Sequence, residues 1–332
     1  MRKEELLHIT TETNSDEVPE FDILGECEID LSEEIPEPEP LLQIGDITLF
    51  SKGNISTIGG AAKSRKTFLI VFLTAKFLEE NPDQSAMIYD TEMAKFHTIR
   101  TARRVHRLIG WEPKKNNKRL KVFSVREYNS DERIKALQQA IERYKPALVF
   151  VDGVRDLVKD FNSPDESSNI VNLLMKWSSL YECHICSVLH ENKIGGQLRG
   201  HLGTEIVNKS ETVIGVSSSG NVSTVKPLFT RNMPFEEFYF TINMEGLPEL
   251  CKPEQVPTNT DKLKQLFESV LGGKESVSYT ELRNALINKL KVAERTAERK
   301  INDGVKLNVI CKNEVNYYHL PKIELIDESL PF

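Results

Sequence analysis

The 332-residue sequence predicts an α/β fold, in which a mostly parallel sheet carries helices on both faces and a small C-terminal winged helix-turn-helix domain follows. Two observations predict it. From residue 47 to residue 189, short apolar runs alternate with amphipathic segments of helical period, which is typical of a parallel sheet. Between residues 261 and 320, three helical segments precede a β-ribbon. A chain of this length is expected to form two folded units.

The most informative stretch is 54–69, where a β-branched run breaks at two glycines and reaches Lys66 and Thr67 before an apolar helical pattern. A loop of this length turns successive backbone N–H groups toward a phosphate, and the next helix adds its positive N-terminus. Lys66 would contact the β- and γ-phosphates, and the Thr67 hydroxyl would ligate Mg²⁺. ATP and Mg²⁺ are therefore the predicted cofactors. The expected nucleotide contacts are Gly60, Ala61, Ala62, Lys63, Ser64, Arg65, Lys66, Thr67 and Phe68.

The loop departs from the pattern G-x-x-x-x-G-K-[ST] at one position. Gly60 occupies the first glycine, but Arg65 stands where the second is expected. A side chain there would either strain the loop or add a cation beside the phosphates. The alternative is an ordinary glycine-rich turn with a solvated Lys-Ser-Arg-Lys run. The strand before the loop and the helix after it favour the phosphate loop.

The elements of the predicted core follow one another in β-α order. We expect strands at 47–50, 55–58, 85–89, 120–125, 147–151 and 185–189, and helices at 67–78, 94–109, 131–144 and 169–181. Three further strands, at 211–216, 221–229 and 235–242, predict an antiparallel extension of the sheet. These segments define a core over 43–246. A linker is expected at 247–260, which holds three prolines and no periodicity.

The N-terminal segment 1–42 is predicted to be an acidic, disordered tail, because it is rich in Glu, Ser, Thr and Pro. Residues 1–45 carry 14 acids against Arg2 and Lys3, a net charge of −12, so the rest of the chain is +5 although the whole is −7. The overall acidity therefore does not exclude a nucleic-acid partner. The tail is a solubilising segment, a docking peptide around 21–24 for a replication or recombination protein, or a mimic of DNA.

The sequence contains no apolar stretch of the roughly 20 residues that a bilayer span requires, which predicts a cytoplasmic protein without membrane contact. The odd number of five cysteines agrees with a reducing compartment. Cys183 and Cys186 form a C-x-x-C, but we expect them on opposite faces of a strand. They are therefore interpreted as core packing.

The segment 261–322 predicts the winged helix, followed by a C-terminal tail at 323–332. A capping box at 278–281 opens its second helix. The unit carries 11 bases and 8 acids between 260 and 320. Duplex DNA is the favoured ligand of its third helix, with a protein partner as the alternative. The candidate contacts on that helix are Arg295, Arg299 and Lys300.

Polar side chains at other strand ends are expected to surround the phosphate loop. Asp152 ends an apolar strand, from which a carboxylate can orient Mg²⁺. Glu92 follows another strand and is the favoured general base, with Asp90 as the competing candidate. His190 ends the last buried strand, at a point from which it could contact the γ-phosphate and link it to the glycine-rich loop beyond.

Together, the motifs at 60–67, 90–93, 150–156, 190–193 and 198–200 resemble those of the RecA-like ATPases, and most closely the RepA-like branch, which includes plasmid and mobile-element replicative helicases. The resemblance covers about residues 45–245. It implies a ring-forming homo-oligomer such as a hexamer, with loops that touch single-stranded DNA. The roles that it implies are nucleotide and metal contacts for Lys66 and Thr67, catalytic glutamate for Glu92, Walker B acid for Asp152, phosphate sensor for His190, and DNA contacts for Lys193 and Arg199.

Members of this family also insert a basic residue of a neighbouring subunit into the active site. Arg231 is our candidate for this catalytic role, with Lys226 second. The sequence thus predicts a Mg²⁺-dependent ATPase that acts on DNA, as a ring-forming helicase or DNA-remodelling motor of a plasmid, phage or mobile element. Two alternatives are a loader that uses ATP as a switch without unwinding, and a DNA-binding regulator that senses nucleotide without hydrolysing it.

Overall fold

The structure is a computed structural model that describes residues 27–191, 198, 200–252 and 259–321. The chain divides into two compact units, Met1–Cys251 and Lys252–Phe332. The docking peptide considered at 21–24 and the tail at 323–332 lie outside the described residues. No helix of the described part is both long enough and apolar enough to cross a bilayer.

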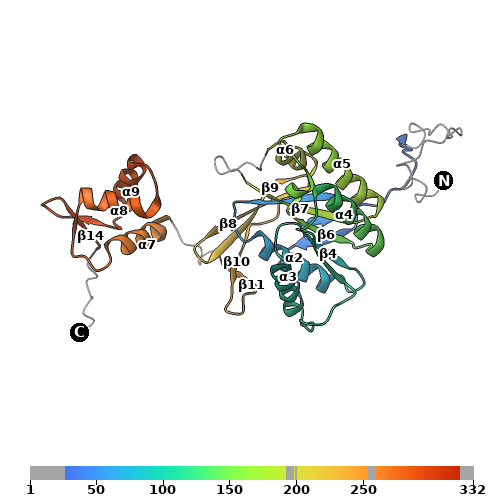
Figure 1. Cartoon of the computed structure of the whole chain (residues 1–332), viewed down its shortest axis with the longest axis horizontal. Helices are drawn as coiled ribbons and strands as arrows, with labels where there is room; N and C mark the ends of the chain where they lie inside the picture. Colours follow the sequence, from blue (N-terminus) through green and yellow to red (C-terminus); the bar gives the residue numbers. More distant parts are fainter. Residues whose placement is uncertain (1–26, 192–197, 199, 253–258, 322–332) are drawn as a thin grey trace. The chain divides into compact units, whose positions relative to one another are not determined.

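A nine-stranded mixed sheet forms the centre of the first unit (Figure 1). Its order is β11-β10-β9-β8-β3-β7-β6-β4-β5. The six strands from β8 to β5 are parallel, and β9, β10 and β11 extend the sheet antiparallel. The strands are β3 (Ile55–Gly60), β4 (Ala86–Asp90), β5 (Leu120–Ser124), β6 (Leu148–Asp152), β7 (His184–His190), β8 (Thr212–Ser219), β9 (Val222–Thr230), β10 (Phe238–Ile242) and β11 (Pro248–Cys251).

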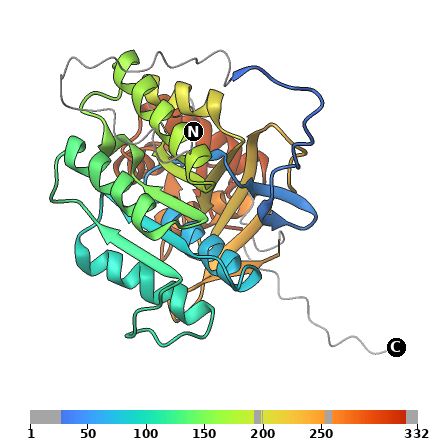
Figure 2. The ribbon, with the colours of Figure 1, turned by 90° about the vertical axis from the view of Figure 1, so that its right-hand side faces the viewer.

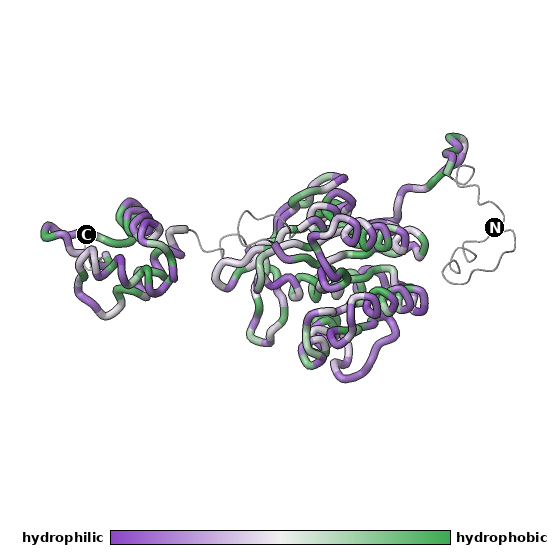
Figure 3. The backbone as a smooth tube through the Cα atoms, turned by 45° about the horizontal axis from the view of Figure 1, so that its top comes forward, coloured by the Kyte–Doolittle hydropathy of each residue, from purple (hydrophilic) through white to green (hydrophobic). Residues whose placement is uncertain are grey.

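Helices cover both faces of this sheet (Figures 1 and 2). Because successive side chains of a strand point to opposite faces, Phe150 packs into one apolar cluster while Val149 and Val151 pack into the other. Hydrophobic segments accordingly run through the interior of the unit (Figure 3). The first cluster includes α2 (Lys66–Glu80) and α3 (Lys95–Leu108), and the second includes α4 (Ser130–Tyr144), α5 (Pro164–Leu180) and α6 (Gly200–Lys209). The predicted α/β fold class, a mostly parallel sheet with helices on both faces, is confirmed.

The two cysteines of the C-x-x-C lie on opposite faces, as predicted. Cys183 belongs to one apolar cluster and Cys186 to the other, and both are fully buried. Burial raises the pKa of the Cys183 thiol to about 12 and that of Cys186 well above its usual value. Neither thiol is therefore a reactive thiolate at neutral pH, and both contribute to packing.

The sheet unit begins earlier than the tail predicted at 1–42 allows. β1 (Pro40–Ile44) pairs antiparallel with β2 (Ile47–Ser51). Leu41 and Leu42 are buried in the same cluster as α2. The disordered tail was predicted from the acidic composition of 1–42 as a whole, which gave these two leucines little weight. Their burial offsets the entropic cost of ordering the segment.

The predicted linker at 247–260 is also too long. Its first residues form β11, which pairs with β10 at the edge of the sheet, where Pro248 lies opposite Ile242. A proline is tolerated on an edge strand because its missing N–H costs no ladder hydrogen bond. Residues 253–258 lie outside the described part, and α7 begins at Asn259.

One helix begins earlier than expected, and one helix was not predicted. α5 begins at Pro164 rather than at 169, because the Ser163 side chain accepts from the backbone N–H of Glu166 and proline is favoured in the first turn. α6 was not predicted: its first residues were assigned to the loop at 191–203, and 204–209 were assigned to no element. Gly200 opens it with φ +67°, and a Cβ there would lie 2.6 Å from the Phe161 ring.

In its described residues, 252 and 259–321, the second unit contains three helices and a three-stranded antiparallel sheet of order β12-β14-β13. Ser278 and Glu281 form the predicted capping box at the start of α8. Phe267 is fully buried beside Gly304, where a Cβ would lie 2.5 Å from its ring. The elements are α7 (Asn259–Leu271), β12 (Val277–Ser278), α8 (Tyr279–Leu290), α9 (Glu294–Lys306), β13 (Cys311–Lys312) and β14 (Tyr317–His319).

Candidate nucleotide-binding site

The predicted phosphate loop connects β3 to α2 at the carboxyl edge of the parallel strands, in the middle of the sheet. Gly60 is required there, because a Cβ would lie 2.3 Å from the Val216 carbonyl oxygen. Ala61, Ala62 and Lys63 are exposed. The Ser64 hydroxyl is buried and has no hydrogen-bond partner among the described residues, as expected of a polar group that a ligand would satisfy.

Arg65 occupies the place of the second glycine in the left-handed conformation, at φ 72° and ψ 28°. This conformation costs a non-glycine residue roughly 1–2 kcal/mol. The guanidinium donates hydrogen bonds to the turn between β8 and β9: to Asn221 O at 2.7 Å, Gly220 O at 3.0 Å and Ser223 Oγ at 3.2 Å. The side chain is therefore held against that turn and does not close the loop.

Lys66 lies at the centre of the site. Its Nζ donates to the carbonyl oxygens of Gly60 and Ala61, both at 2.9 Å, and contacts His190 Nδ1 at 3.0 Å. Burial lowers the pKa of Lys66, while the carboxylates of Asp152 and Glu92 oppose that shift. A bound phosphate would offer this buried ammonium stronger acceptors than two carbonyls.

Thr67 and Asp152, the two predicted metal ligands, lie in contact at the carboxyl edge of the sheet. Thr67 Oγ1 donates to Asp152 Oδ2 at 2.9 Å. Burial raises the pKa of Asp152 to about 6, against the Thr67 hydrogen bond that lowers it. A buried carboxylate beside a hydroxyl provides hard oxygen ligands, and these two residues fit Mg²⁺. Among the described residues, no group of three or more His, Cys, Asp or Glu side chains is placed to hold a metal ion.

The two acids at the carboxyl end of β4, Asp90 and Glu92, have different surroundings. Asp90 is buried, and its carboxylate accepts from Thr98 Oγ1 at 2.6 Å and from the backbone N–H groups of Met93 at 2.8 Å and Glu92 at 3.1 Å. Asp90 thus holds the backbone of this turn. The Glu92 side chain is 58% exposed and lines the cavity described below. The geometry favours Glu92 over Asp90 as the residue available to a substrate.

His190 connects Lys66 to Glu92. Because the Lys66 ammonium can only donate, His190 Nδ1 accepts and the ring proton lies on Nε2, which is 3.5 Å from Glu92 Oε2. This hydrogen bond is the main cause that lowers the pKa of Glu92. The three side chains therefore form one continuous polar array that keeps Glu92 ionised.

These residues surround a cavity of about 320 Å³, which we call the nucleotide cavity. Sequence analysis missed the wall that α3 contributes. The Arg104 guanidinium lies 4.4 Å from the centre of the Phe68 ring, and burial lowers its pKa, as do the nearby Arg100 and Arg107. The signal was present as helical spacing of basic and polar residues. The additional lining residues are Met93, His97, Arg100, Thr101 and Arg104.

The structure does not bring Arg231 to the nucleotide cavity of its own chain. Its backbone N–H bonds Glu211 at the amino end of β8, which is the opposite edge of the sheet. Its guanidinium donates to the carbonyls of Lys209 at 3.2 Å and Asn208 at 3.5 Å, at the end of α6. Lys226, the second candidate, is exposed in the middle of β9.

The predicted DNA contacts divide into two groups. Lys193 and Arg199 lie outside the described residues. Arg295 and Arg299 are exposed on α9, one turn apart, and Lys300 is half-buried. The opposite side of α9, through Ala297 and Ile301, packs into the core of the second unit.

Comparison with known proteins finds similarity at the level of solved structures. No family model matches the chain. No curated protein matches it either. Among solved structures, the "ATPase Domain of G40P" is similar with a TM-score of 0.47 and 13% identity, over 60% of this chain and 85% of that one. A likeness at this level does not define a function.

Proposed function

We propose that this chain is a Mg²⁺-dependent ATPase with a RecA-like core. One observation carries the proposal: the residues expected to bind and hydrolyse a nucleoside triphosphate surround a single cavity although they come from four separate strand ends. They are Lys66, Thr67, Glu92, Asp152 and His190.

The chain's own groups divide the work among them. The loop amides and the N-terminus of α2 bind the phosphates, and Lys66 transfers its hydrogen bonds from the loop carbonyls to the β- and γ-phosphates. Thr67 and Asp152 would hold Mg²⁺, and the ion would supply positive charge for the phosphate oxygens. Glu92 takes a proton from the attacking water. His190 orients the Glu92 carboxylate through Nε2 and contacts the Lys66 ammonium through Nδ1, so that a movement of Lys66 would affect Glu92.

We further propose that the ATPase acts on DNA as a ring-forming homo-oligomer, a helicase or remodelling motor. Two observations support this. Arg231 is remote from the nucleotide cavity of its own chain, so only a neighbouring subunit could supply it there. The second unit has the three helices and β-ribbon of a winged helix, with Arg295 and Arg299 exposed on its third helix.

A loader that uses ATP as a switch, without unwinding, is the second candidate. Arg65 favours it, because three hydrogen bonds tie the phosphate loop to the β8–β9 turn. A stiffened loop suits slow turnover and a long-lived bound state.

The test combines nucleotide binding, turnover and unwinding. We expect wild-type protein to bind a fluorescent ATP analogue and hydrolyse ATP faster with single-stranded DNA. Lys66→Ala should lose nucleotide binding by at least about 100-fold, because it removes a charged hydrogen-bond donor to phosphate. Lys76→Ala is the matched control, since Lys76 lies on the same helix and pairs with Glu80.

Each outcome distinguishes the candidates. Unwinding of a forked DNA supports the helicase, whereas DNA-stimulated turnover without unwinding supports the loader. Nucleotide binding without turnover, together with binding to a specific duplex, indicates the regulator. Equal nucleotide binding by wild-type protein and Lys66→Ala would contradict the site itself.

A further inference from the structure

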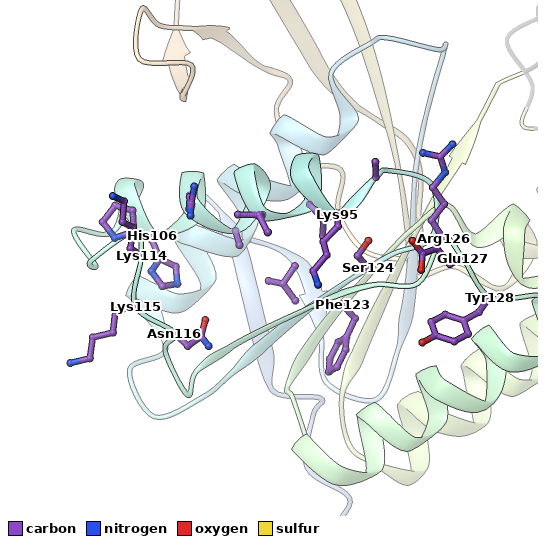
Figure 4. A pocket seen from close by; sticks show the side chains of 17 residues that line it. Lys95, His106, Lys114, Lys115, Asn116, Phe123, Ser124, Arg126, Glu127 and Tyr128 are labelled. Carbon is purple, nitrogen blue, oxygen red and sulfur yellow. The ribbon is translucent and has the colours of Figure 1, made fainter.

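A second and larger cavity lies beside α3 (Figure 4). Its volume is about 850 Å³, and its walls are α3, β5 and the segments 113–116 and 126–128. We call it the basic cavity. It shares no lining residue with the nucleotide cavity, so the proposed hydrolysis leaves it without a role.

The charged lining of the basic cavity is almost entirely cationic. Within the described part of the chain, none of its lysines or arginines forms an ion pair with a carboxylate. Several unpaired like charges around one hollow raise the local concentration of anions. The lining cations are Lys95, Arg103, Lys114, Lys115 and Arg126, against the single acid Glu127.

These cations are spread along the cavity and do not converge on one point. Figure 4 shows Lys114 and Lys115 at one end, Lys95 between, and Arg126 at the other end. A compact anion such as free phosphate would be held by donors that meet at a single place. Charges in a row instead fit an anion that is itself extended, such as a phosphodiester chain.

Aromatic rings accompany the cations. Tyr128 is 54% exposed and lies at the same end of the cavity as Arg126 (Figure 4). Phe123 belongs to the wall and is fixed by ring contacts with Tyr89 and Tyr144, at 6.2 and 5.8 Å between centroids. Bases of a single strand stack on such rings, whereas the base faces of a duplex are already covered by one another.

We propose that the basic cavity binds a single strand of nucleic acid, with its backbone along the lysines and arginines and a base on Tyr128. The inference rests on the proposed function in that it names a place where the ATPase holds its nucleic-acid substrate. This place differs from both the loop after β7 and the third helix of the second unit.

The site is connected to the proposed chemistry through α3. Thr98 lines the basic cavity, and its hydroxyl donates to Asp90 at 2.6 Å. The same carboxylate accepts from the backbone N–H groups of Met93 and Glu92. A bound nucleic-acid strand that shifts α3 would therefore move the turn that carries the general base, Glu92. This contact provides a route by which the nucleic acid stimulates ATP turnover.

The first test compares two triple variants of the full chain. Lys114→Gln/Lys115→Gln/Arg126→Gln removes three cavity cations, and Lys135→Gln/Lys176→Gln/Lys209→Gln removes three exposed cations elsewhere. Binding of labelled oligothymidylate is followed by anisotropy over a range of salt concentrations. The cavity variant should bind at least about tenfold more weakly, and its slope of log K against log salt should fall by about 2. The slope of the control variant should differ from the wild-type slope by less than about 1.

The second test locates the strand. An oligonucleotide that carries 4-thiouracil should crosslink to the peptide that contains Tyr128, and the crosslink should disappear in Tyr128→Ala. Equal loss of affinity in the two triple variants, or crosslinks confined to other peptides, would overturn the inference. Thymidine monophosphate and unlabelled oligonucleotide are also compared as competitors at equal concentrations of nucleotide. If the two compete equally well, the inference is overturned, and the cavity binds a small nucleotide instead.

Failure of this inference is separable from failure of the proposed function. Binding of a fluorescent ATP analogue is measured on the same variants and depends on the nucleotide cavity. Normal ATP binding with no crosslink at Tyr128 contradicts the basic cavity alone. Absence of ATP binding in the wild type, with a crosslink at Tyr128, contradicts the ATPase but not the strand site.

Discussion

At the scale of single residues, neighbouring acids have different roles because their surroundings differ. Asp90 uses its carboxylate to hold the turn after β4, whereas Glu92 is ionised and lines the nucleotide cavity. Sequence reasoning could name both candidates, but it could not show which one had its oxygens already occupied. The same holds for Arg65, whose side chain is directed away from the loop by acceptors on a distant turn.

The prediction at this scale concerns Glu92→Gln. The amide keeps the size of the side chain and can still contact His190, so nucleotide binding should stay within about threefold of wild type. Turnover should fall by roughly 100-fold or more, because an amide cannot accept a proton from water. Phosphate release and binding of an ATP analogue measure the two effects. Glu79→Gln, on the exposed side of α2, is the control. Full turnover in Glu92→Gln would move the general-base role to another residue.

At the scale of elements, alternation and caps predicted most of the strands and helices of the sheet unit. β1, β11 and α6 were missed because each depends on contacts distant in sequence. Leu41 and Leu42 are ordered only by the cluster around α2, β11 by the edge of β10, and α6 by its place against the second face of the sheet. The local amino-acid composition does not predict contacts of this kind.

The start of β7 provides a pH-dependent contact between elements. His184 is fully buried and stacks on Phe50 of β2, with ring centroids 4.4 Å apart, and its Nδ1 donates to Ser51 O at 2.8 Å. Burial lowers its pKa to about 4 from 6.5. The folded state therefore keeps His184 neutral while the unfolded chain takes up a proton. The resulting stability is present above pH 6.5 and is lost as the pH falls through 4.

We expect this group to remove roughly 2 kcal/mol from the free energy of unfolding between pH 7 and pH 4.5. Urea unfolding at the two pH values should show this loss in wild type and much less of it in His184→Gln. Burial raises the pKa of Asp152 to about 6, so this residue changes the free energy of unfolding in the opposite direction as the pH falls. Asp152 is present in both proteins, and its effect cancels from the comparison. His201→Gln, an exposed site, is the control. An unchanged pH dependence in His184→Gln would contradict the assignment.

At the scale of the whole molecule, the position of Arg231 relates the proposed activity to the proposed assembly of several chains. The nucleotide cavity contains cations of its own chain on the loop and on α3, but Arg231 lies at the opposite edge of the sheet. If the active site takes a positive charge from a neighbour, hydrolysis depends on assembly.

Mixing experiments test this expectation. Arg231→Ala should lose most of its turnover while it still binds nucleotide. A one-to-one mixture with Lys66→Ala, which is inactive but retains Arg231, should recover roughly a quarter of the wild-type rate by random assortment of subunits. Because Arg231 also bonds the end of α6, thermal unfolding must show that the variant is folded. An active Arg231→Ala, or a mixture without recovery, would remove Arg231 from the site.

The sequence by itself determined the fold class, the position of the candidate phosphate loop and the set of polar residues at the strand ends, because periodicity and loop chemistry are local properties of the chain. Only the tertiary structure decided which of those residues share one cavity, where Arg65 and Arg231 extend, and that α3 separates a nucleotide cavity from a basic one. These outcomes depend on the order of strands in the sheet and on contacts between residues far apart in the chain, and a linear pattern specifies neither.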